Sequence, residues 1–230
     1  MQPLSVERLK VSYGQSQVIS ELSLAVGESE IVAVMGRNGM GKTTLFKAMI
    51  GLLPAKSGEI KVNGENVTGR APYERVGRGL AYVPQGRMVF PTLTVEENIK
   101  TGLRSTKADV PGEIYEFFPV LKEMRKRRGG NLSGGQQQQL AIARALASNP
   151  KVLLLDEPTE GIQPSIIKEL AEILKRIRDQ RQLAILVSEQ VLSFALAVAD
   201  RVLVIDRGRI IQESARADVD EQSLSRQLSV

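Results

Sequence analysis

The sequence predicts an α/β fold organised around a mostly parallel sheet. Three segments, at residues 151–155, 183–187 and 201–205, are predicted as strands because they are short, apolar and rich in Val, Leu and Ile. Residues 164–178 and 190–199, which separate these strands, have the apolar spacing of helices. Strands that alternate with helices favour parallel pairing, with helices packed on the faces of the sheet.

The first third of the chain is predicted to be rich in strands. Alternating or continuous apolar runs predict strands at residues 4–12, 18–26, 30–35 and 80–83. Asn63-Gly64 lies between two apolar alternations in residues 58–67, which is a strong signal for a β-hairpin.

Helices are predicted in the remaining segments. Residues 42–53 have helical spacing that stops at Pro54, and residues 134–148 form a second helical pattern. Thr94, followed by Glu97 at the third helical position, predicts a capped helix start. A turn at residues 206–208 predicts a last hairpin, followed by a short amphipathic terminal helix.

The composition excludes several kinds of chemistry. The chain has 230 residues, a formal charge of +5, and neither Cys nor His. Disulfides, thiolate metal sites and reactions that need a His base are therefore excluded. No apolar run approaches the ~18 residues that a membrane-spanning helix needs. The basic run at residues 124–128 fits a solvated helix end better than a nucleic-acid footprint.

The first chemical motif is a glycine-rich loop between a predicted strand and a predicted helix. It consists of Gly36, Arg37, Asn38, Gly39, Met40, Gly41, Lys42, Thr43 and Thr44. This spacing is the P-loop pattern, in which backbone N–H groups and a helix N-terminus surround a phosphate. We expect Lys42 to reach the β- and γ-phosphates of ATP and the Thr43 hydroxyl to ligate Mg²⁺.

The second motif ends an apolar strand with two carboxylates. Asp156 follows Leu153-Leu154-Leu155, so it should lie at the carboxyl edge of a parallel sheet and hold Mg²⁺. Glu157 points differently and is expected to polarise the attacking water. An Asp-Glu pair by itself is commonplace, but beside a P-loop it predicts hydrolysis.

The ordered motifs GRNGMGKTT, VPQG, LSGGQQQ and LLLDEPTEG resemble the nucleotide-binding subunits of ABC transporters over residues 4–212. The resemblance implies an ABC-type P-loop NTPase fold with an N-terminal antiparallel β-subdomain. The expected parts are a RecA-like core plus β-subdomain at 1–93 and 150–215, an inserted helical subdomain at 94–149, and a tail at 216–230.

The resemblance also implies roles for further residues. Tyr13 would stack on adenine, and Gln85 would contact Mg²⁺ and the catalytic water. The signature segment Ser133, Gly134, Gly135 and Gln136 would close over the γ-phosphate held by the P-loop of a second subunit. Each chain would then supply half of two ATP sites in a head-to-tail pair, with itself or with a related cassette.

Two positions depart from the family pattern. Gln190 occupies the place of the usual His, so a neutral amide would contact the γ-phosphate and could not carry a proton. The catalytic set is accordingly Glu157, Gln190 and Lys42. Gln163 stands where the family more often has Asp, which weakens the carry-over of a subunit contact.

Several segments of the chain, including those with the two departures, resemble the ATPase subunits of importers of branched-chain amino acids and of urea or short-chain amides. The segments that carry this likeness are residues 83–87, 90–98, 158–164 and 189–190. Residues 159–165 and the ending 228–230 favour the urea branch, with branched-chain amino acids as the alternative. A soluble ABC ATPase acting on nucleic acid is the alternative of a different class, although the compact interval from Lys42 to Ser133 argues against it.

The implied partners are the second ATPase subunit, transmembrane permease subunits and, indirectly, a solute-binding protein. The chain would lie peripherally on the cytoplasmic face of the membrane and would bind no nucleic acid. Residues 88–91, Met-Val-Phe-Pro, would line the groove that receives a permease helix. A satellite core beneath the helical part explains these apolar residues equally well.

Overall fold

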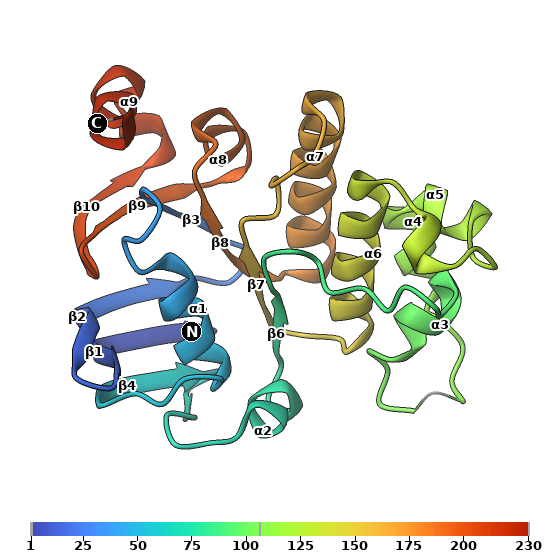
Figure 1. Ribbon diagram of the computed structural model, residues 1–230, viewed down its shortest axis with the longest axis horizontal. Coiled ribbons are helices and arrows are strands. Elements are labelled where there is room, and N and C mark those ends of the chain that lie inside the picture. Colours follow the sequence, from blue (N-terminus) through green and yellow to red (C-terminus); the bar gives the residue numbers. More distant parts are fainter. Residues whose placement is uncertain (1, 106, 230) are drawn as a thin grey trace.

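The computed structural model describes residues 2–105 and 107–229. Within them the chain forms a six-stranded sheet of order β10-β9-β3-β8-β7-β6 and a four-stranded sheet of order β2-β1-β4-β5 (Figure 1). The pairs β6–β7, β7–β8, β3–β8 and β3–β9 are parallel, and β10 pairs antiparallel with β9 at the edge. The mostly parallel sheet and the antiparallel N-terminal sheet are confirmed.

The bounds of the elements agree closely with the segments expected from the sequence. The strands are β1 Leu4–Tyr13, β2 Ser16–Val26, β3 Ile31–Met35, β4 Ser57–Val62, β5 Glu65–Asn66, β6 Leu80–Val83, β7 Val152–Asp156, β8 Ala184–Glu189, β9 Arg201–Asp206 and β10 Arg209–Ala215. The α-helices are α1 Lys42–Ile50, α2 Pro72–Gly77, α3 Val95–Lys100, α4 Gly112–Phe117, α5 Pro119–Glu123, α6 Gly134–Ala147, α7 Pro164–Arg181, α8 Leu192–Val198 and α9 Glu221–Ser229. Short 3₁₀ helices span Gly129–Asn131 and Arg216–Asp218.

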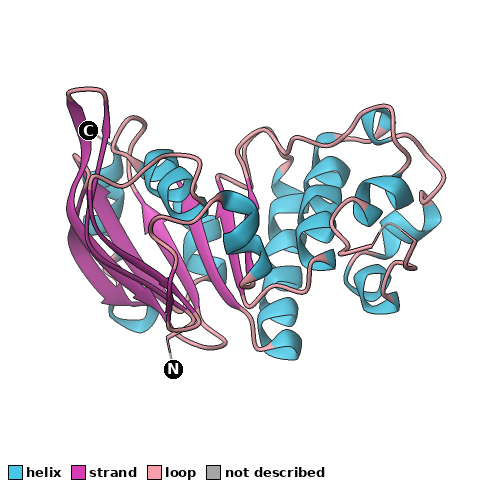
Figure 2. Cartoon of the chain, turned by 90° about the horizontal axis from the view of Figure 1, so that it is seen from below, coloured by secondary structure: helices cyan, strands magenta, loops and turns pink. Residues whose placement is uncertain are grey.

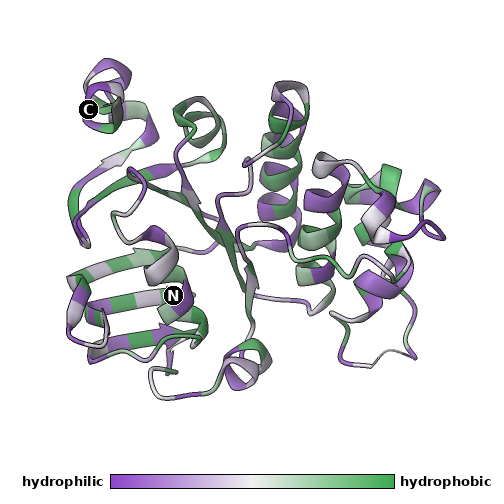
Figure 3. Ribbon diagram, viewed as in Figure 1, coloured by the Kyte–Doolittle hydropathy of each residue, from purple (hydrophilic) through white to green (hydrophobic). Residues whose placement is uncertain are grey.

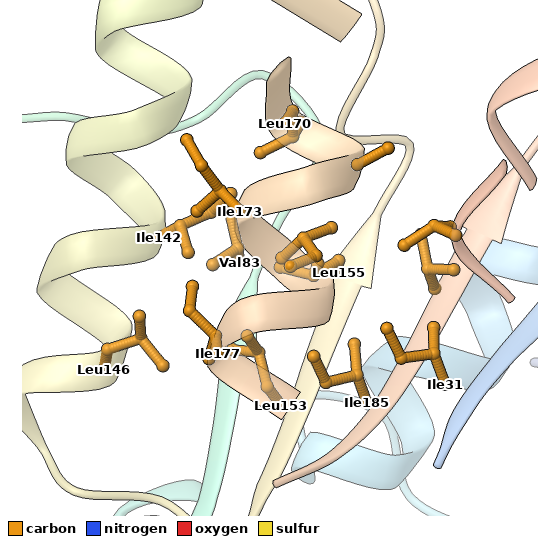
Figure 4. Close-up of a cluster of buried hydrophobic side chains, with 14 of the residues drawn as sticks. Ile31, Val83, Ile142, Leu146, Leu153, Leu155, Leu170, Ile173, Ile177 and Ile185 are labelled. Carbon is orange, nitrogen blue, oxygen red and sulfur yellow. The ribbon is translucent and has the colours of Figure 1, made fainter. Parts of the chain in front are cut away.

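The central strands are buried on both faces and divide their side chains between two cores. Ile31, Ala33 and Met35 of β3 join the core beneath α6, α7 and α8, whereas Val32 and Val34 join the core beneath α1 and the antiparallel sheet. This alternation follows from the two-residue period of a strand. Figure 4 shows the first core, where Ile142 and Leu146 of α6 and Ile173 and Ile177 of α7 meet the strands.

Helices α3, α4, α5, α6 and α7 lie at the opposite end of the molecule from the antiparallel sheet (Figure 1 and Figure 2). Helix α7 is amphipathic, with its apolar side on the sheet and its charged side outward (Figure 3). In the described residues no helix combines the length and hydropathy needed to cross a membrane. The subdomain boundaries given above remain a proposal, and Val230 of the predicted tail lies outside the described residues.

Two predicted helix bounds were wrong, and one helix was not predicted. Helix α1 ends at Ile50 instead of 53, because Gly51 adopts a left-handed conformation (φ 91°) whose N–H caps the carbonyls of Lys47 and Ala48. The six-residue helix α2 was not predicted. Helix α8 begins at Leu192 instead of 190, because the Gln190 and Val191 N–H groups donate to the Glu189 carboxylate.

A buried arginine joins α2 to the end of α1. Arg75 is 2% exposed, and its guanidinium donates to the carbonyls of Ala48 and Met49, both at 2.8 Å, and of Thr68 and Arg70. The carbonyls at a helix C-terminus lack intrahelical partners and carry partial negative charge. Burial lowers the pKa of Arg75, but the carbonyls satisfy its donors.

We expect Arg75→Met to reduce the free energy of unfolding by about 3 kcal/mol, because several buried carbonyls lose a charged donor at once. Urea denaturation monitored by circular dichroism measures the change. Arg70→Met is the matched control, since it removes an exposed ion pair with Glu74 and should leave the midpoint unchanged. Equal midpoints for all three proteins would contradict the anchoring role of Arg75.

Candidate functional site

The loop between β3 and α1 bends around a cavity of about 220 Å³ at the N-terminus of α1. The N-cap of the helix is Gly41, whose φ of 105° a residue with a side chain adopts only at a cost. The first turn of α1 contains no acidic residue, so its free N–H groups and positive end favour an anion.

The cavity lining unites seven of the fifteen residues expected to bind nucleotide, together with Glu157. It consists of Val18, Asn38, Gly39, Gly41, Lys42, Thr43, Thr44, Gln85 and Glu157. Gly36, Arg37 and Met40 belong to the same loop but do not line the cavity. Tyr13 also lies outside the lining, 48% exposed at the end of β1. Val18 was not predicted from the sequence.

Lys42 is held where a phosphate-binding cation is needed. Its side chain is 3% exposed, and its ammonium group donates to the carbonyls of Gly36 at 2.7 Å and Arg37 at 3.2 Å. The same ammonium forms an ion pair of 3.2 Å with Glu157. The loop carbonyls therefore aim the charge into the cavity, next to the predicted base.

Three hydroxyl groups surround the carboxylate of Asp156 at the end of β7. Oδ1 accepts from Ser188 at 2.6 Å and from Thr43 at 3.3 Å, and Oδ2 accepts from Tyr82 at 3.1 Å. Burial raises the pKa of Asp156, and the three hydroxyls oppose that rise. Burial and the neighbouring Asp156 raise the pKa of Tyr82, which therefore remains a hydrogen-bond donor.

The oxygen donors at this point fit Mg²⁺, whose preferred ligands are carboxylate, hydroxyl and phosphate oxygens. Asp156 and Thr43 lie within hydrogen-bonding distance of each other, and Gln85 lines the same cavity. No group of three or more His, Cys, Asp or Glu side chains in the described ranges could hold a metal ion by itself. Mg²⁺ sites commonly use one or two carboxylates together with substrate phosphates.

Glu157 is positioned by β8 and by Gln190. Its N–H donates to the carbonyl of Ser188 at 3.0 Å, and its backbone has φ 48°, in the left-handed region. Such a conformation in a residue other than Gly costs energy and is concentrated at functional sites. Gln190 Nε2 donates to Glu157 Oε2 at 2.8 Å, so the amide touches the carboxylate directly.

The signature segment forms the start of α6. Ser133 is the N-cap, and a capping box joins it to Gln136: the Gln136 N–H donates to Ser133 Oγ, and the Ser133 N–H donates to Gln136 Oε1. A Cβ at Gly135 would lie 2.7 Å from Ile166, so this glycine is required for α6 to approach α7. Residues 133–136 contribute nothing to the cavity lining of their own chain.

Arg87 links three predicted functional segments. It follows Gln85 closely, and its Nη2 donates to the carbonyl of Glu160 at 2.6 Å and to that of Gly161 at 3.4 Å. A Cβ at Gly134 would lie 3.2 Å from the Gly161 carbonyl oxygen and 3.4 Å from the Arg87 guanidinium. The Gln85 loop, the loop after Glu157 and the start of α6 therefore meet at one place.

Tyr82, Arg87 and Ser188 belong to the site but were not predicted from the sequence. Tyr82 is the polar residue in the otherwise apolar strand β6, and Ser188 follows four apolar residues within β8 at the carboxyl edge of the sheet. Both positions are signals that sequence reading could have used.

Comparisons with known proteins agree with this site. A family model described as ABC transporter matches residues 19–160. The branched-chain amino acid transport ATP-binding protein BraG of Pseudomonas aeruginosa is 41% identical over 218 residues, which cover 93% of each chain. The protein described as the probable branched-chain amino acid transport ATP-binding protein LivF of Archaeoglobus fulgidus is 36% identical, over 90% of this chain and 89% of its own length.

A transport ATPase with a different role is also similar to this chain. The lipopolysaccharide export protein LptB of Haemophilus influenzae is 36% identical and covers 96% of this chain and 95% of its own. Among solved structures, a nucleotide-free ATP-binding cassette of an ABC transporter has a TM-score of 0.86 at 25% identity, covering 97% of this chain and 94% of that one. The chain therefore belongs to the ABC transporter family, as an ATPase whose hydrolysis of ATP is coupled to transport.

Proposed function

We propose that this chain is the ATPase subunit of an importer for branched-chain amino acids. The observation that carries the ATPase role is the meeting of Lys42 and Glu157 in one cavity at the N-terminus of α1, with Asp156 hydrogen-bonded to Thr43 of the same lining. The similarity to BraG and LivF supports the cargo. Urea, which the sequence patterns favoured, is not confirmed, and the alternative of branched-chain amino acids has the better support.

In the proposed mechanism the loop at residues 36–44 binds the phosphates through its N–H groups and Lys42. Asp156, Thr43 and Gln85 would hold Mg²⁺, which neutralises charge on the phosphates when it is bound. Glu157 accepts a proton from the attacking water, and Gln190 donates a hydrogen bond that orients Glu157. Tyr13 is proposed to stack on adenine.

A second ATPase subunit would complete each site. Residues 133–136 lie outside the cavity of their own chain, yet they present a helix N-terminus with free N–H groups. The Oγ atom of Ser133 accepts the cap bond, so its O–H hydrogen can donate to a phosphate. We propose that this surface closes on the ATP of a head-to-tail partner, which is a second copy or a related cassette.

An apolar groove offers a docking place for the permease. It has a volume of about 570 Å³ and is lined by Val76, Ala81, Tyr82, Pro84, Met88, Phe90, Thr101, Gly102, Arg144, Ala145 and Ser148. Met88 and Phe90 are 68% and 46% exposed, so these two side chains do not form a satellite core. Arg144 packs over the Phe90 ring at 5.3 Å and donates to the Met88 carbonyl, which holds the rim in shape.

We expect Met88→Glu to weaken binding to the permease at least about tenfold, because a charge would be buried without a partner. ATP hydrolysis by the isolated chain should not change. Co-purification with the detergent-solubilised permease measures the first effect, and phosphate release measures the second. Leu52→Glu, at an exposed apolar residue outside the groove, is the control; equal binding by both variants would exclude the groove as the docking place.

We expect Gln190→Ala to lower turnover about 2- to 12-fold, because one neutral hydrogen bond worth about 0.5–1.5 kcal/mol is lost. The measurement is steady-state phosphate release at saturating ATP. Loss as complete as that of Glu157→Gln would show that Gln190 has a larger role than orientation.

The cargo is tested by transport. The permease complex that contains this chain is reconstituted in vesicles with its solute-binding protein, and ATP-dependent uptake of labelled leucine and labelled urea is compared. We expect uptake of leucine. Uptake of urea alone would overturn the proposed cargo but leave the ATPase role intact.

A further inference from the structure

A buried carboxylate that the mechanism above does not use lies at the end of β8. Glu189 is 1% exposed. Its Oε1 accepts from the Thr159 hydroxyl at 2.6 Å and the Thr159 N–H at 3.1 Å. Its Oε2 accepts from the N–H groups of Gln190 at 2.8 Å and Val191 at 3.0 Å. These four donors, all within the described residues, are neutral.

Burying a carboxylate without a cation is unfavourable. Burial raises the pKa of Glu189, while Thr159 and the N–H groups of residues 190 and 191 oppose the rise. An apolar side chain at this position would avoid the cost of desolvation. The carboxylate does something an apolar group cannot, because each of its oxygens holds a different segment of chain.

The two segments that Glu189 holds carry the two residues assigned to hydrolysis. Thr159 lies two residues after Glu157, and Gln190 directly follows Glu189. The segments also meet through their side chains, since Gln190 Nε2 donates to Glu157 Oε2 at 2.8 Å. The contacts form a closed ring from Glu157 through Thr159, Glu189 and Gln190 back to Glu157.

We propose that Glu189 is a positioning residue, whose carboxylate fixes the Glu157 segment against the Gln190 segment so that Gln190 can orient Glu157. The inference rests on the roles proposed above for Glu157 and Gln190. Helix α8 starts only at Leu192, because the two N–H groups before it donate to this carboxylate. The local backbone is thus shaped by the same four bonds.

The proposal requires a charged acceptor at position 189. In Glu189→Gln the amide keeps the shape of the side chain. Its NH₂ group, however, is a donor and would face either the donors of Thr159 or the N–H groups of Gln190 and Val191, so the hydrogen bonds on that side would be lost. We expect kcat to fall about 2- to 12-fold, as in Gln190→Ala, because the hydrogen bond that orients Glu157 is lost in both variants. KM for ATP should stay within about twofold, because the phosphate loop is untouched.

Two substitutions of Thr159 distinguish a positioning role from a packing role. They test the proposal even if Glu189→Gln fails to fold. Thr159→Val keeps the shape of the side chain and removes the O–H donor, whereas Thr159→Ser keeps the donor and removes a methyl group. We expect Val to lower kcat about tenfold and Ser to stay within about twofold of the unmodified chain. Equal behaviour of Val and Ser, whether active or inactive, would overturn the proposal.

A double-variant cycle tests whether Glu189 acts through Gln190. If it does, Gln190→Ala should lower kcat much less in the Glu189→Gln background than in the unmodified chain. Independent, multiplicative effects would overturn the proposal. Glu30→Gln is the control for loss of a partly buried carboxylate, since Glu30 binds Arg201 and the Gly27 N–H at the other end of β3; we expect it to leave kcat unchanged.

Measurement of Glu157→Gln in parallel distinguishes failure of the proposed catalytic role of Glu157 from failure of the proposed positioning role of Glu189. If it retains full turnover, the proposed catalytic assignment fails, and the positioning role fails with it. If it is inactive while Glu189→Gln and Thr159→Val both match the unmodified chain, only the positioning role is overturned.

Discussion

The variant Glu157→Gln should still bind ATP, but its turnover should fall about 10²- to 10⁴-fold. The amide preserves the shape of the side chain but cannot accept a proton from water. The substitution also removes the 3.2 Å ion pair with Lys42, while the backbone N–H groups and the Lys42 ammonium group that bind phosphate stay in place. Phosphate release and equilibrium binding of labelled ATP measure the two effects separately.

Glu172→Gln is the matched control for that variant, because it neutralises an exposed carboxylate paired with Lys175 on α7. Its turnover should equal that of the unmodified chain. Substantial residual hydrolysis by Glu157→Gln would remove Glu157 from the catalytic set. The nearby Asp156 is no substitute, since hydroxyls occupy its oxygens.

The solution mass of Glu157→Gln with ATP and Mg²⁺ then identifies the partner. Because hydrolysis is blocked, a closed pair should accumulate. A doubled mass would show that residues 133–136 of one copy close on the cavity of another. A monomer with ATP demonstrably bound would indicate that the other half of each site comes from a different cassette.

Lys42→Ala is the second change with a large expected effect. Its ammonium group is almost fully buried and is aimed into the cavity by the Gly36 and Arg37 carbonyls. Removing this preorganised charge should lower turnover at least about 100-fold and weaken ATP binding. Affinity for AMP should change much less, because the lysine addresses the β- and γ-phosphates.

Lys47→Ala, on the same helix but at its other end, serves as the control for that loss of charge. Isothermal titration with ATP and AMP gives both affinities for each variant. Unchanged ATP affinity together with unchanged turnover in Lys42→Ala would contradict the role of Lys42.

Local patterns made much of the fold predictable. The capping box of Thr94 and Glu97 depends on residues three apart, and the structure contains it as expected. The turn at Asn63-Gly64 likewise needs only its neighbours. Strands buried on both faces stand out as continuous apolar runs, so the central sheet could be predicted from composition and spacing.

Contacts between distant segments could not be predicted in this way. Ser188 and Asp156 lie 32 residues apart and meet because β7 and β8 pair with those two residues in register. The need for Gly135 comes from Ile166 on another helix, which the local sequence does not reveal. The Glu189 carboxylate looks like an ordinary strand end until its four donors are seen together.

Two neighbouring residues of α2 face different parts of the molecule. Val76 lines the apolar groove, while the Arg75 guanidinium is fixed among the carbonyls at the end of α1. Lys42 lies at the other end of α1, about 12 Å from Ile50 along the helix axis. If α2 were displaced at the groove, Arg75 would carry that displacement to the end of α1, and the other end of this helix adjoins the phosphate loop.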